Sequence, residues 1–332
     1  MSRRLLALCL LLMLLWQPAV AEFVVSDATA VPAATPVPTP SPVTRPEPFL
    51  GWPELDSEGF LPEGERAFVH VDEEAGHWAY ADQRLKVHIE RRVWREGKQP
   101  RVYYFISHIF FRDGEHFRAY SKDPRQPARK MDKPETIARE HKLVYAQNGD
   151  LFTWRIQKKR FPGVIIRDGR ILGDQTYNKA TINIPPLDEL SLYADGHIEI
   201  NAPGRFSAQD YLDKGALDVF AFGPTLLKDG LKDERLFSNS YRSLEPRSAI
   251  GVVAPGHFVG ILVEGRNKRS NGAGLNFVAS RLLEENVTEA FTLDGGQTAA
   301  MVFMGKIVMD PGTYSGYTKT RQQPDVIGIG KK

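Results

Sequence analysis

Two short polar segments each follow an apolar run that has the length of a buried strand. Residues 148–150 (Asn-Gly-Asp) follow the run 143–147, and residues 294–296 (Asp-Gly-Gly) follow the run 290–293. A carboxylate can stabilise a developing cation, a second acidic group can manage an attacking water, and glycines let backbone N–H groups approach an anion. If the two strands are neighbours, both segments lie on one rim of a sheet, where ligand sites are commonly built.

Ordinary turn chemistry is the alternative for both segments, because Asn, Asp and Gly all favour turns. Gly305-Lys306, between two short apolar runs, is expected to be a plain hairpin of this kind. Asp294 is favoured as a functional residue, since it ends a buried strand at a loop with more glycine than a turn requires. Asn148 and Asp150 stay open between the two interpretations.

Three units of helix, strand and glycine-containing loop position these segments. The first has a helix from Pro134 to His141, and the second has Ser207 and Asp210 in capping-box spacing before the strand 217–222. The third has an amphipathic helix from Leu275, followed by the strand 290–293. Repeated helix-to-strand units predict a mixed sheet.

Other patterns indicate antiparallel pairing. Residues 85–90 alternate between apolar and polar side chains, and they are expected to form a hairpin with 101–111. Asp-Gly pairs between short apolar runs predict further hairpin turns, at 113–114, 168–169, 195–196 and 229–230. We therefore expect an α+β fold of mixed, largely antiparallel β-sheets with a few packing helices, in a single domain over residues 49–332.

The N-terminal region has the composition of an export signal and a tether. A basic start, the apolar run 5–16 and a small-x-small ending predict a signal peptide over residues 1–21, cleaved after Ala21. An uncleaved anchor is the alternative, although the run is short for a membrane span. Residues 22–48 are expected to be a Pro/Ala/Thr-rich linker. Cys9 is the one cysteine, so a mature chain would have no thiol or disulfide. Cleavage after Ala21 would also remove the apolar run, so no transmembrane domain is expected in the mature chain.

The charge balance of the 332-residue chain argues against a nucleic-acid partner. Lysine and arginine total 43 and aspartate and glutamate total 41, and the basic residues are scattered. The 42% hydrophobic content is sufficient for a full core.

Five blocks of the sequence occur in an order that resembles the phosphodiester glycosidase family. These are Asn148-Gly149 with Phe152, the Gly-Pro-x-Leu segment with Asp-Gly at 223–230, residues 245–251, residues 259–266, and the helix from Leu275 with residues 291–296. The resemblance runs from about Tyr80 to the C-terminus. It implies a secreted or lumenal α+β domain that cleaves an α-linked sugar phosphodiester, releases free sugar and leaves a phosphomonoester.

The resemblance also implies roles for particular residues. The expected catalytic residues are Asp294, Arg247 and Asp150, and the expected substrate-binding residues are Asn148, Gly149, Gly295, Gly296, Thr298 and Arg321. A guanidinium offers a phosphodiester two parallel charge-assisted hydrogen bonds that an ammonium does not. For Arg247 the alternative is an exposed arginine at a strand end.

One departure from the family pattern bears on function. Relatives continue with a third glycine, whereas Gln297 follows Gly296 here. We expect a secreted or envelope-exposed hydrolase that acts on a glycan or sugar-1-phosphate diester, with a cell-surface glycan as partner. The alternatives are a non-catalytic module for glycan binding or exopolysaccharide assembly, and a phosphodiesterase that leaves phosphate on the sugar.

Metal and cofactor chemistry finds little support in the sequence. The eight histidines have no i, i+4 pair and no cysteine beside them, which argues against a zinc site. No cofactor is required, while a divalent cation held by the oxygens of Asp294 or Asp150 stays open. Glu264, which ends a predicted strand before Gly265, is expected to be a solvated turn residue.

Overall fold

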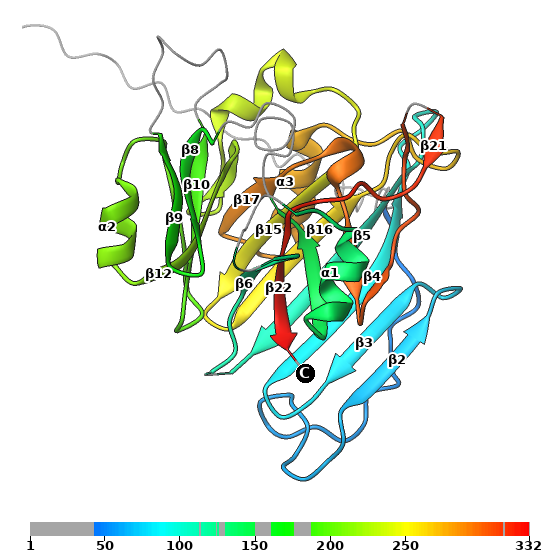
Figure 1. Cartoon of the computed structure of the whole chain (residues 1–332). Helices are drawn as coiled ribbons and strands as arrows, with labels where there is room; N and C mark the ends of the chain where they lie inside the picture. Colours follow the sequence, from blue (N-terminus) through cyan, green and yellow to red (C-terminus); the bar gives the residue numbers. More distant parts are fainter. Residues whose placement is uncertain are drawn as a thin grey trace, which may run out of the picture. The chain divides into compact units, whose positions relative to one another are not determined.

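Antiparallel sheets dominate the computed structural model (Figure 1), which describes residues 43–112, 114–123, 125, 130–149, 161–175, 187–314 and 316–331. The predicted signal peptide, nearly all of the linker and Asp150 lie outside the described residues. Residues 41–332 form one compact unit. Among the described residues, no helix has the length and apolarity needed to cross a membrane.

A ten-stranded sheet forms the largest layer. Its order is β14 (Leu231–Lys232), β13 (Thr225–Lys228), β17 (Glu289–Leu293), β15 (Arg247–Ala254), β16 (His257–Val263), β5 (Val102–Phe111), β4 (Leu85–Trp94), β3 (His77–Ala81) and β2 (Phe68–Asp72), with β1 (Val43–Thr44) beside β4.

Two five-stranded sheets and a small hairpin complete the strands. One has the order β19 (Lys306–Ile307), β18 (Met301–Phe303), β7 (Leu143–Asn148), β22 (Asp325–Lys331) and β6 (Arg118–Ser121). The other has the order β11 (Ile198–Asn201), β10 (Asp188–Tyr193), β12 (Ala216–Phe222), β8 (Gly163–Arg167) and β9 (Arg170–Gln175). The hairpin joins β20 (Thr313–Tyr314) to β21 (Tyr317–Thr318).

The helices are short. They are α1 (Pro134–Glu140), α2 (Ala208–Asp213) and α3 (Leu275–Glu284), with 3-10 turns η2 (Glu234–Phe237), η3 (Asn239–Tyr241) and η4 (Gly296–Thr298). The predicted capping box of α2 is present, because Ser207 and Asp210 each bond the backbone N–H of the other. The fold is thus α+β, with the β-sheets dominant.

The prediction of a mixed sheet is wrong, because every strand pairing within the described residues is antiparallel. The strands that follow α1, α2 and α3 are β7, β12 and β17, and each belongs to a different sheet. A helix between two strands imposes parallel pairing only when both strands are neighbours in one sheet. Here each helix joins two strands of one sheet that are separated by a third strand; α3, for example, joins β16 to β17 across β15. The two strands are therefore not paired with each other.

The predicted hairpins are largely confirmed. β4 and β5 pair from Leu85 opposite Phe111 to Trp94 opposite Val102. Asp-Gly turns join β8 to β9, β10 to β11 and β13 to β14. At 168–169 and 229–230 both turn residues have positive φ, the conformation that a two-residue hairpin requires. Asp113 lies outside the described residues.

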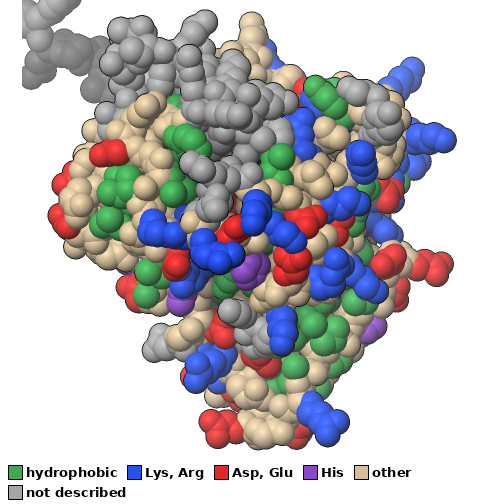
Figure 2. All heavy atoms as spheres, in the orientation of Figure 1, with side chains coloured by type: hydrophobic (Ala, Val, Ile, Leu, Met, Phe, Trp, Pro, Cys, Tyr) green, Lys and Arg blue, Asp and Glu red, His purple; other side chains and the backbone are tan. Residues whose placement is uncertain are grey.

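Apolar side chains cover both faces of the ten-stranded sheet. On one face Ile89 and Phe105 belong to a core shared with Tyr145 and Ile327 of the β7–β22 sheet. On the other face α3 buries Val278 and its apolar neighbours against β15 and β16. Full burial of one such side chain stabilises the fold by about 2 kcal/mol. On the surface, Figure 2 shows acidic and basic side chains interspersed over the visible face.

A buried carboxyl in the β10 sheet makes stability depend on pH. Burial raises the pKa of Glu189 to about 7, although the Tyr211 hydroxyl donates to it at 2.8 Å. The folded state therefore holds the Glu189 proton more tightly than the unfolded state does. The stability gained from this proton is fully present below about pH 4.5 and is lost as pH rises through about 7.

Glu189→Gln is therefore expected to stabilise the protein at pH 8 by up to about 3 kcal/mol, and to change stability little at pH 4. The amide keeps an oxygen that accepts from Tyr211 but has no charge to desolvate. Urea unfolding of both proteins at the two pH values checks this. An equal difference at pH 4 and pH 8 would contradict it.

Candidate functional site

The buried side chain of Asn148 joins the ends of β7 and β17. Its Nδ2 donates to the carbonyls of Gly149 at 2.9 Å and Asp294 at 2.8 Å, and its Oδ1 accepts from the Ala300 N–H at 3.0 Å. The Asp294 N–H also donates to the Gly149 carbonyl, at 3.3 Å. The expected meeting of the two polar segments is therefore present, although β7 and β17 belong to different sheets and are not paired.

The contacts of Asn148 and Gly149 are those of positioning residues. Asn148 directs both ends of its amide into the protein. At Gly149, a Cβ would lie 2.1 Å from Oδ1 of Asp325, whose Oδ2 accepts from the buried Arg167 Nε at 2.8 Å. Any side chain at position 149 would collide with this pair, so glycine is required here by close packing.

The loop after Asp294 folds back on the start of β15. The Gly296 N–H donates to the Pro246 carbonyl at 2.9 Å, and the Thr298 N–H donates to the Gly295 carbonyl at 3.2 Å. A Cβ at Gly295 would lie 2.8 Å from the Pro246 oxygen, and Gly296 has a φ of +61°. Both glycines are thus needed for the shape of this loop.

Arg247 lies beside this loop as the first residue of β15. Its Nε donates to the Ala273 carbonyl at 3.0 Å and its Nη2 to the Ser243 carbonyl at 2.9 Å. Its Nη1 lies on the Gly295 side, 3.8 Å from the position of a Cβ there. Burial lowers the pKa of Arg247, with Asp294 among the charges that oppose the shift. An arginine stays cationic after a moderate shift, so Arg247 places a charge next to the loop.

Two further arginines border the same loop. Arg321 donates from Nη1 to the Thr298 hydroxyl and from Nη2 to Oε1 of Gln297, both at 3.2 Å. Nη1 of Arg266 would lie 3.3 Å from a Cβ at Gly296, and its Nη2 pairs with Oε2 of Glu245 at 2.5 Å.

Sequence reasoning missed the contribution of Arg266 to this cationic rim, and that of Tyr314. The guanidinium groups of Arg266 and Arg321 lie 5.5 and 5.7 Å from the centroid of the Tyr314 ring. Gly265-Arg266 ends one of the family-like blocks, and that position was the available signal. Arg266 also has a φ of +55°, a conformation that is uncommon outside glycine and that marks tightly constrained loops.

Together these groups can bind an anion beside a carboxylate. Asp294, Gly295, Gly296 and Thr298 belong to one loop, and Arg247 and Arg321 border it. A neighbouring pocket is lined by Pro246, Glu264, Gly265, Gly296, Gln297, Ala299, Met309, Asp310, Lys319 and Thr320, among others. Asp150, the remaining predicted residue, lies outside the described residues. Among the residues that are described, no group of three metal-ligating side chains includes Asp294.

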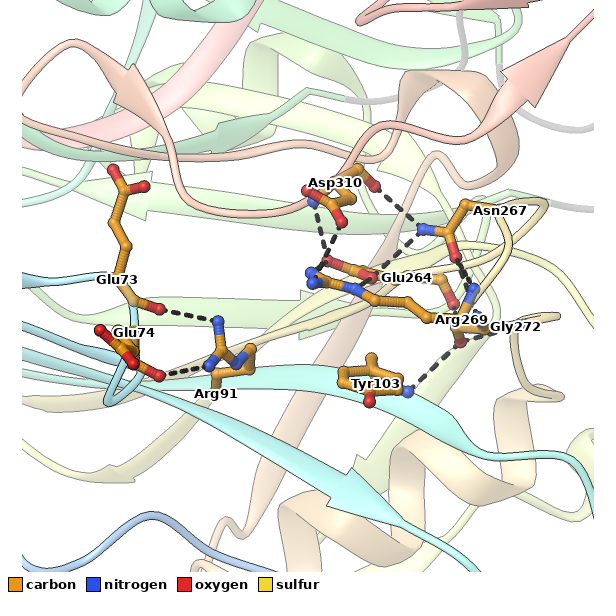
Figure 3. Close-up of polar contacts among 10 residues, drawn as sticks. Glu73, Glu74, Arg91, Tyr103, Glu264, Asn267, Arg269, Gly272 and Asp310 are labelled. Atoms are coloured by element: carbon orange, nitrogen blue, oxygen red, sulfur yellow. Dashed lines mark hydrogen bonds and ion pairs between the residues drawn. The ribbon is translucent and has the colours of Figure 1, made fainter.

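Glu264 supports the pocket wall and is not the solvated turn residue that was expected. It is 2% exposed, and its carboxylate bonds Nε and Nη2 of Arg269 at 2.7 and 2.5 Å (Figure 3). It also accepts from Nδ2 of Asn267 at 3.2 Å and from the Asp310 N–H at 2.8 Å. One carboxylate thus holds together the loops 264–270 and 309–312. The sequence did not indicate this burial, because the partners of Glu264 lie in loops that follow it in the chain.

Glu264→Gln is expected to lower the free energy of unfolding by about 2 kcal/mol, because an amide cannot replace the charged hydrogen bonds to Arg269. Chemical denaturation at neutral pH measures the loss. Glu284→Gln is the matched control. Its partner, Arg281, is one helical turn away, and the Glu284 side chain is 40% exposed, so a change below about 0.5 kcal/mol is expected. Equal losses would contradict a special role for Glu264.

Comparison with known proteins supplies relatives for this arrangement. A family model described as phosphodiester glycosidase matches residues 141–330. The SPbeta prophage-derived uncharacterized protein YomE of Bacillus subtilis is 30% identical over 176 residues, which are 52% of this chain and 26% of YomE. The match thus spans about a quarter of that relative.

Solved structures resemble the fold at low identity. The zebrafish N-acetylglucosamine-1-phosphodiester alpha-N-acetylglucosaminidase catalytic domain, auto-inhibited by its pro-peptide, matches with a TM-score of 0.59 and 19% identity. The match covers 75% of this chain and 84% of that one. A hypothetical protein from Synechocystis matches with a TM-score of 0.50 and 12% identity, over 80% of this chain and 71% of that one.

Proposed function

Because the chain belongs to the phosphodiester glycosidase family, we propose that it hydrolyses the bond between a sugar and the phosphate of a glycan or sugar-1-phosphate diester. The products are free sugar and a phosphomonoester. The observation that carries the proposal is the loop 294–298, where the Asp294 carboxylate is followed by glycines and bordered by Arg247 and Arg321. The carboxylate of Asp294 and the guanidinium groups of Arg247 and Arg321 suit a substrate of this kind. Its phosphate oxygens carry negative charge, and its anomeric carbon gains positive charge as the bond breaks.

In the proposed mechanism the arginines bind the phosphodiester. Nη1 of Arg247 has no hydrogen-bond partner within the described part of the chain, so it can donate to a phosphate oxygen without breaking a contact. Arg321 meets the substrate from the Thr298 side of the loop. Since phosphate is a competent leaving group, arginine stabilisation of its charge reduces the need for a strong general acid.

Asp294 acts on the sugar side of the bond. As the anomeric carbon loses the phosphate oxygen, the ring gains oxocarbenium character, which a carboxylate stabilises or traps. Asn148 positions Asp294 through its backbone, since Nδ2 of Asn148 donates to the Asp294 carbonyl oxygen. This contact does not involve the Asp294 carboxylate. Water then completes the hydrolysis, with Asp150 proposed as the second acidic group.

The proposed setting is outside the cytoplasm, at the cell envelope or in the medium. It rests on the basic and apolar start of the chain and on the small-x-small ending at Ala21. A surface or extracellular glycan phosphodiester is the proposed substrate class.

Product analysis tests the proposal. The purified protein is incubated with simple sugar-1-phosphate diesters and UDP-sugars, and free reducing sugar is measured. Multiple turnovers that release free sugar support the glycosidase. Release of sugar phosphate would instead identify a phosphodiesterase, which cleaves on the other side of phosphorus.

A binding module for sugar phosphates is the second candidate. It is favoured by the contact in which Oε1 of Gln297 accepts from Nη2 of Arg321, because that contact occupies an arginine at the loop. Saturable binding of sugar phosphates without release of sugar would support it. Gln297→Gly would then be expected to start turnover, since the substitution removes the Gln297 contact from Nη2 of Arg321 and restores the third glycine of the family pattern.

A further inference from the structure

We propose that His77, His88 and Glu90 form a zinc-binding site on the face of the ten-stranded sheet. His77 on β3 and Glu90 on β4 are directly opposed in the antiparallel ladder. His88 lies two residues before Glu90, so its side chain leaves the same face of β4. Two adjacent strands therefore bring two imidazoles and a carboxylate together.

The ligand atoms have separations that suit one metal ion. Nδ1 of His77 lies 3.2 Å from Nε2 of His88, and each of the three residues offers an atom within 4.8 Å of the others. Zinc holds nitrogen ligands at about 2.0–2.1 Å, so two tetrahedral nitrogens are roughly 3.4 Å apart. The observed nitrogen separation is close to this value. Three protein ligands would leave a fourth position for water.

The outer contact of His77 fixes the tautomer that a metal requires. Its Nε2 lies 2.8 Å from the Glu47 carbonyl oxygen, which only accepts, so the neutral ring holds its proton on Nε2. Nδ1 therefore presents its lone pair toward His88. Metal-ligating histidines commonly donate their other N–H to a carbonyl or carboxylate in this way.

Glu90 is oriented from its other side by Arg92. Nη2 of Arg92 lies 2.9 Å from Oε2 of Glu90, while Oε1 of Glu90 lies 3.8 Å from Nδ1 of His88. Arg92 also pairs with Glu285 at 2.5 Å, so its charge is shared between two carboxylates. One carboxylate oxygen thus remains on the His88 side.

The segment after β1 covers this cluster with aromatic side chains. The Phe49 ring centroid lies 5.7 Å from His77 and 5.5 Å from His88, and Trp52 lies 5.8 Å from His88. His77 is 4% exposed. An apolar cover around polar ligands limits solvent access and strengthens metal binding. Because His77 also bonds the Glu47 carbonyl, a bound ion would fasten this segment to the sheet, in a chain whose one cysteine is at position 9.

A second histidine pair nearby provides a matched control. Nδ1 of His108 lies 3.1 Å from Nε2 of His257, and Nε2 of His108 bonds the Glu285 carboxylate at 3.1 Å. Within the described residues this pair is not part of a group of three possible ligands. It has the same type of histidine contact and a carboxylate partner, but its ligand atoms do not all lie within 4.8 Å of one another.

The test uses the untagged protein after removal of metal with a chelator. Zinc is titrated against a chromophoric chelator, and Co²⁺ is added separately as a spectroscopic probe. We expect one zinc per chain and a tetrahedral Co²⁺ absorption band. His77→Asn and His88→Asn should each weaken zinc affinity by at least about 100-fold, and Glu90→Gln by at least about 10-fold. His257→Asn should leave the affinity unchanged.

Hydrogen exchange provides a readout that does not depend on variants. Zinc should slow exchange in residues 45–52 of the wild type, because the ion fastens this segment through His77. The proposal is overturned if the wild type binds no zinc at micromolar concentration. It is also overturned if the His77/His88 double variant, folded by circular dichroism, binds zinc as the wild type does, or if His257→Asn removes binding equally. Those outcomes would leave the cluster as a hydrogen-bonded histidine pair.

Discussion

Asp294→Ala is expected to reduce kcat by at least about 1,000-fold, about 4 kcal/mol of transition-state stabilisation. The carboxylate is the group proposed to stabilise positive charge at the anomeric carbon. The fold should persist, because the contacts with Asn148 and Gly149 use the backbone carbonyl and N–H of Asp294, which alanine retains. Initial rates of sugar release from a saturating phosphodiester measure the loss.

Two further variants make the Asp294 result specific. Asp294→Asn keeps the shape without the charge and should lose a similar amount of activity. Asp310→Asn changes a carboxylate that lines the neighbouring pocket but is 63% exposed and pairs with Arg269, and it should change kcat less than about threefold. Full activity in the Asp294→Ala protein would remove Asp294 from the mechanism.

Arg247→Lys is expected to lower kcat/KM by about 100-fold, about 2.7 kcal/mol. Three nitrogens of the guanidinium have separate positions here. Two donate to the carbonyls of Ala273 and Ser243, and the third lies on the Gly295 side. An ammonium is a single point of charge and cannot hold both carbonyls while also presenting a fixed donor to phosphate on the Gly295 side. Steady-state kinetics at several substrate concentrations measure the effect.

The control for Arg247 is Arg242→Ala, which removes an exposed positive charge five residues earlier. It should change kcat/KM by less than about twofold at physiological salt, because exposed charges are screened. If Arg247→Lys retains full turnover, the proposed role of Nη1 of this guanidinium is wrong. If both variants lose activity equally, general electrostatic attraction explains the effect.

Much of the local structure could be predicted because the signals are short in range. Alternation over 85–90 predicts a strand, and two Asp-Gly pairs adopt the positive φ values that such a turn requires. The apolar stripe that starts at Leu275 predicts α3. Pairing of strands could not be derived in the same way. Short helices before β7 and β17 look alike in sequence, whereas the sheet that each strand joins depends on the packing of the whole unit.

The amino-acid sequence by itself determined the family, the order of the polar blocks and the candidate chemistry at Asp294, because these depend on residue types and their order. Only the tertiary structure decided which of these residues meet. Asn148 reaches Asp294 across 146 positions, and Glu264 is buried by partners from later loops.

The histidine cluster shows the same limit. A search for i, i+4 pairs applies to helices, whereas His77 and His88 meet because strand register sets neighbouring residues opposite one another. Register is a property of paired strands, and a single strand has no contact that would reveal it. Contacts of this range are selected by burial and hydrogen bonding in the folded unit, so they leave no periodic signal in the chain.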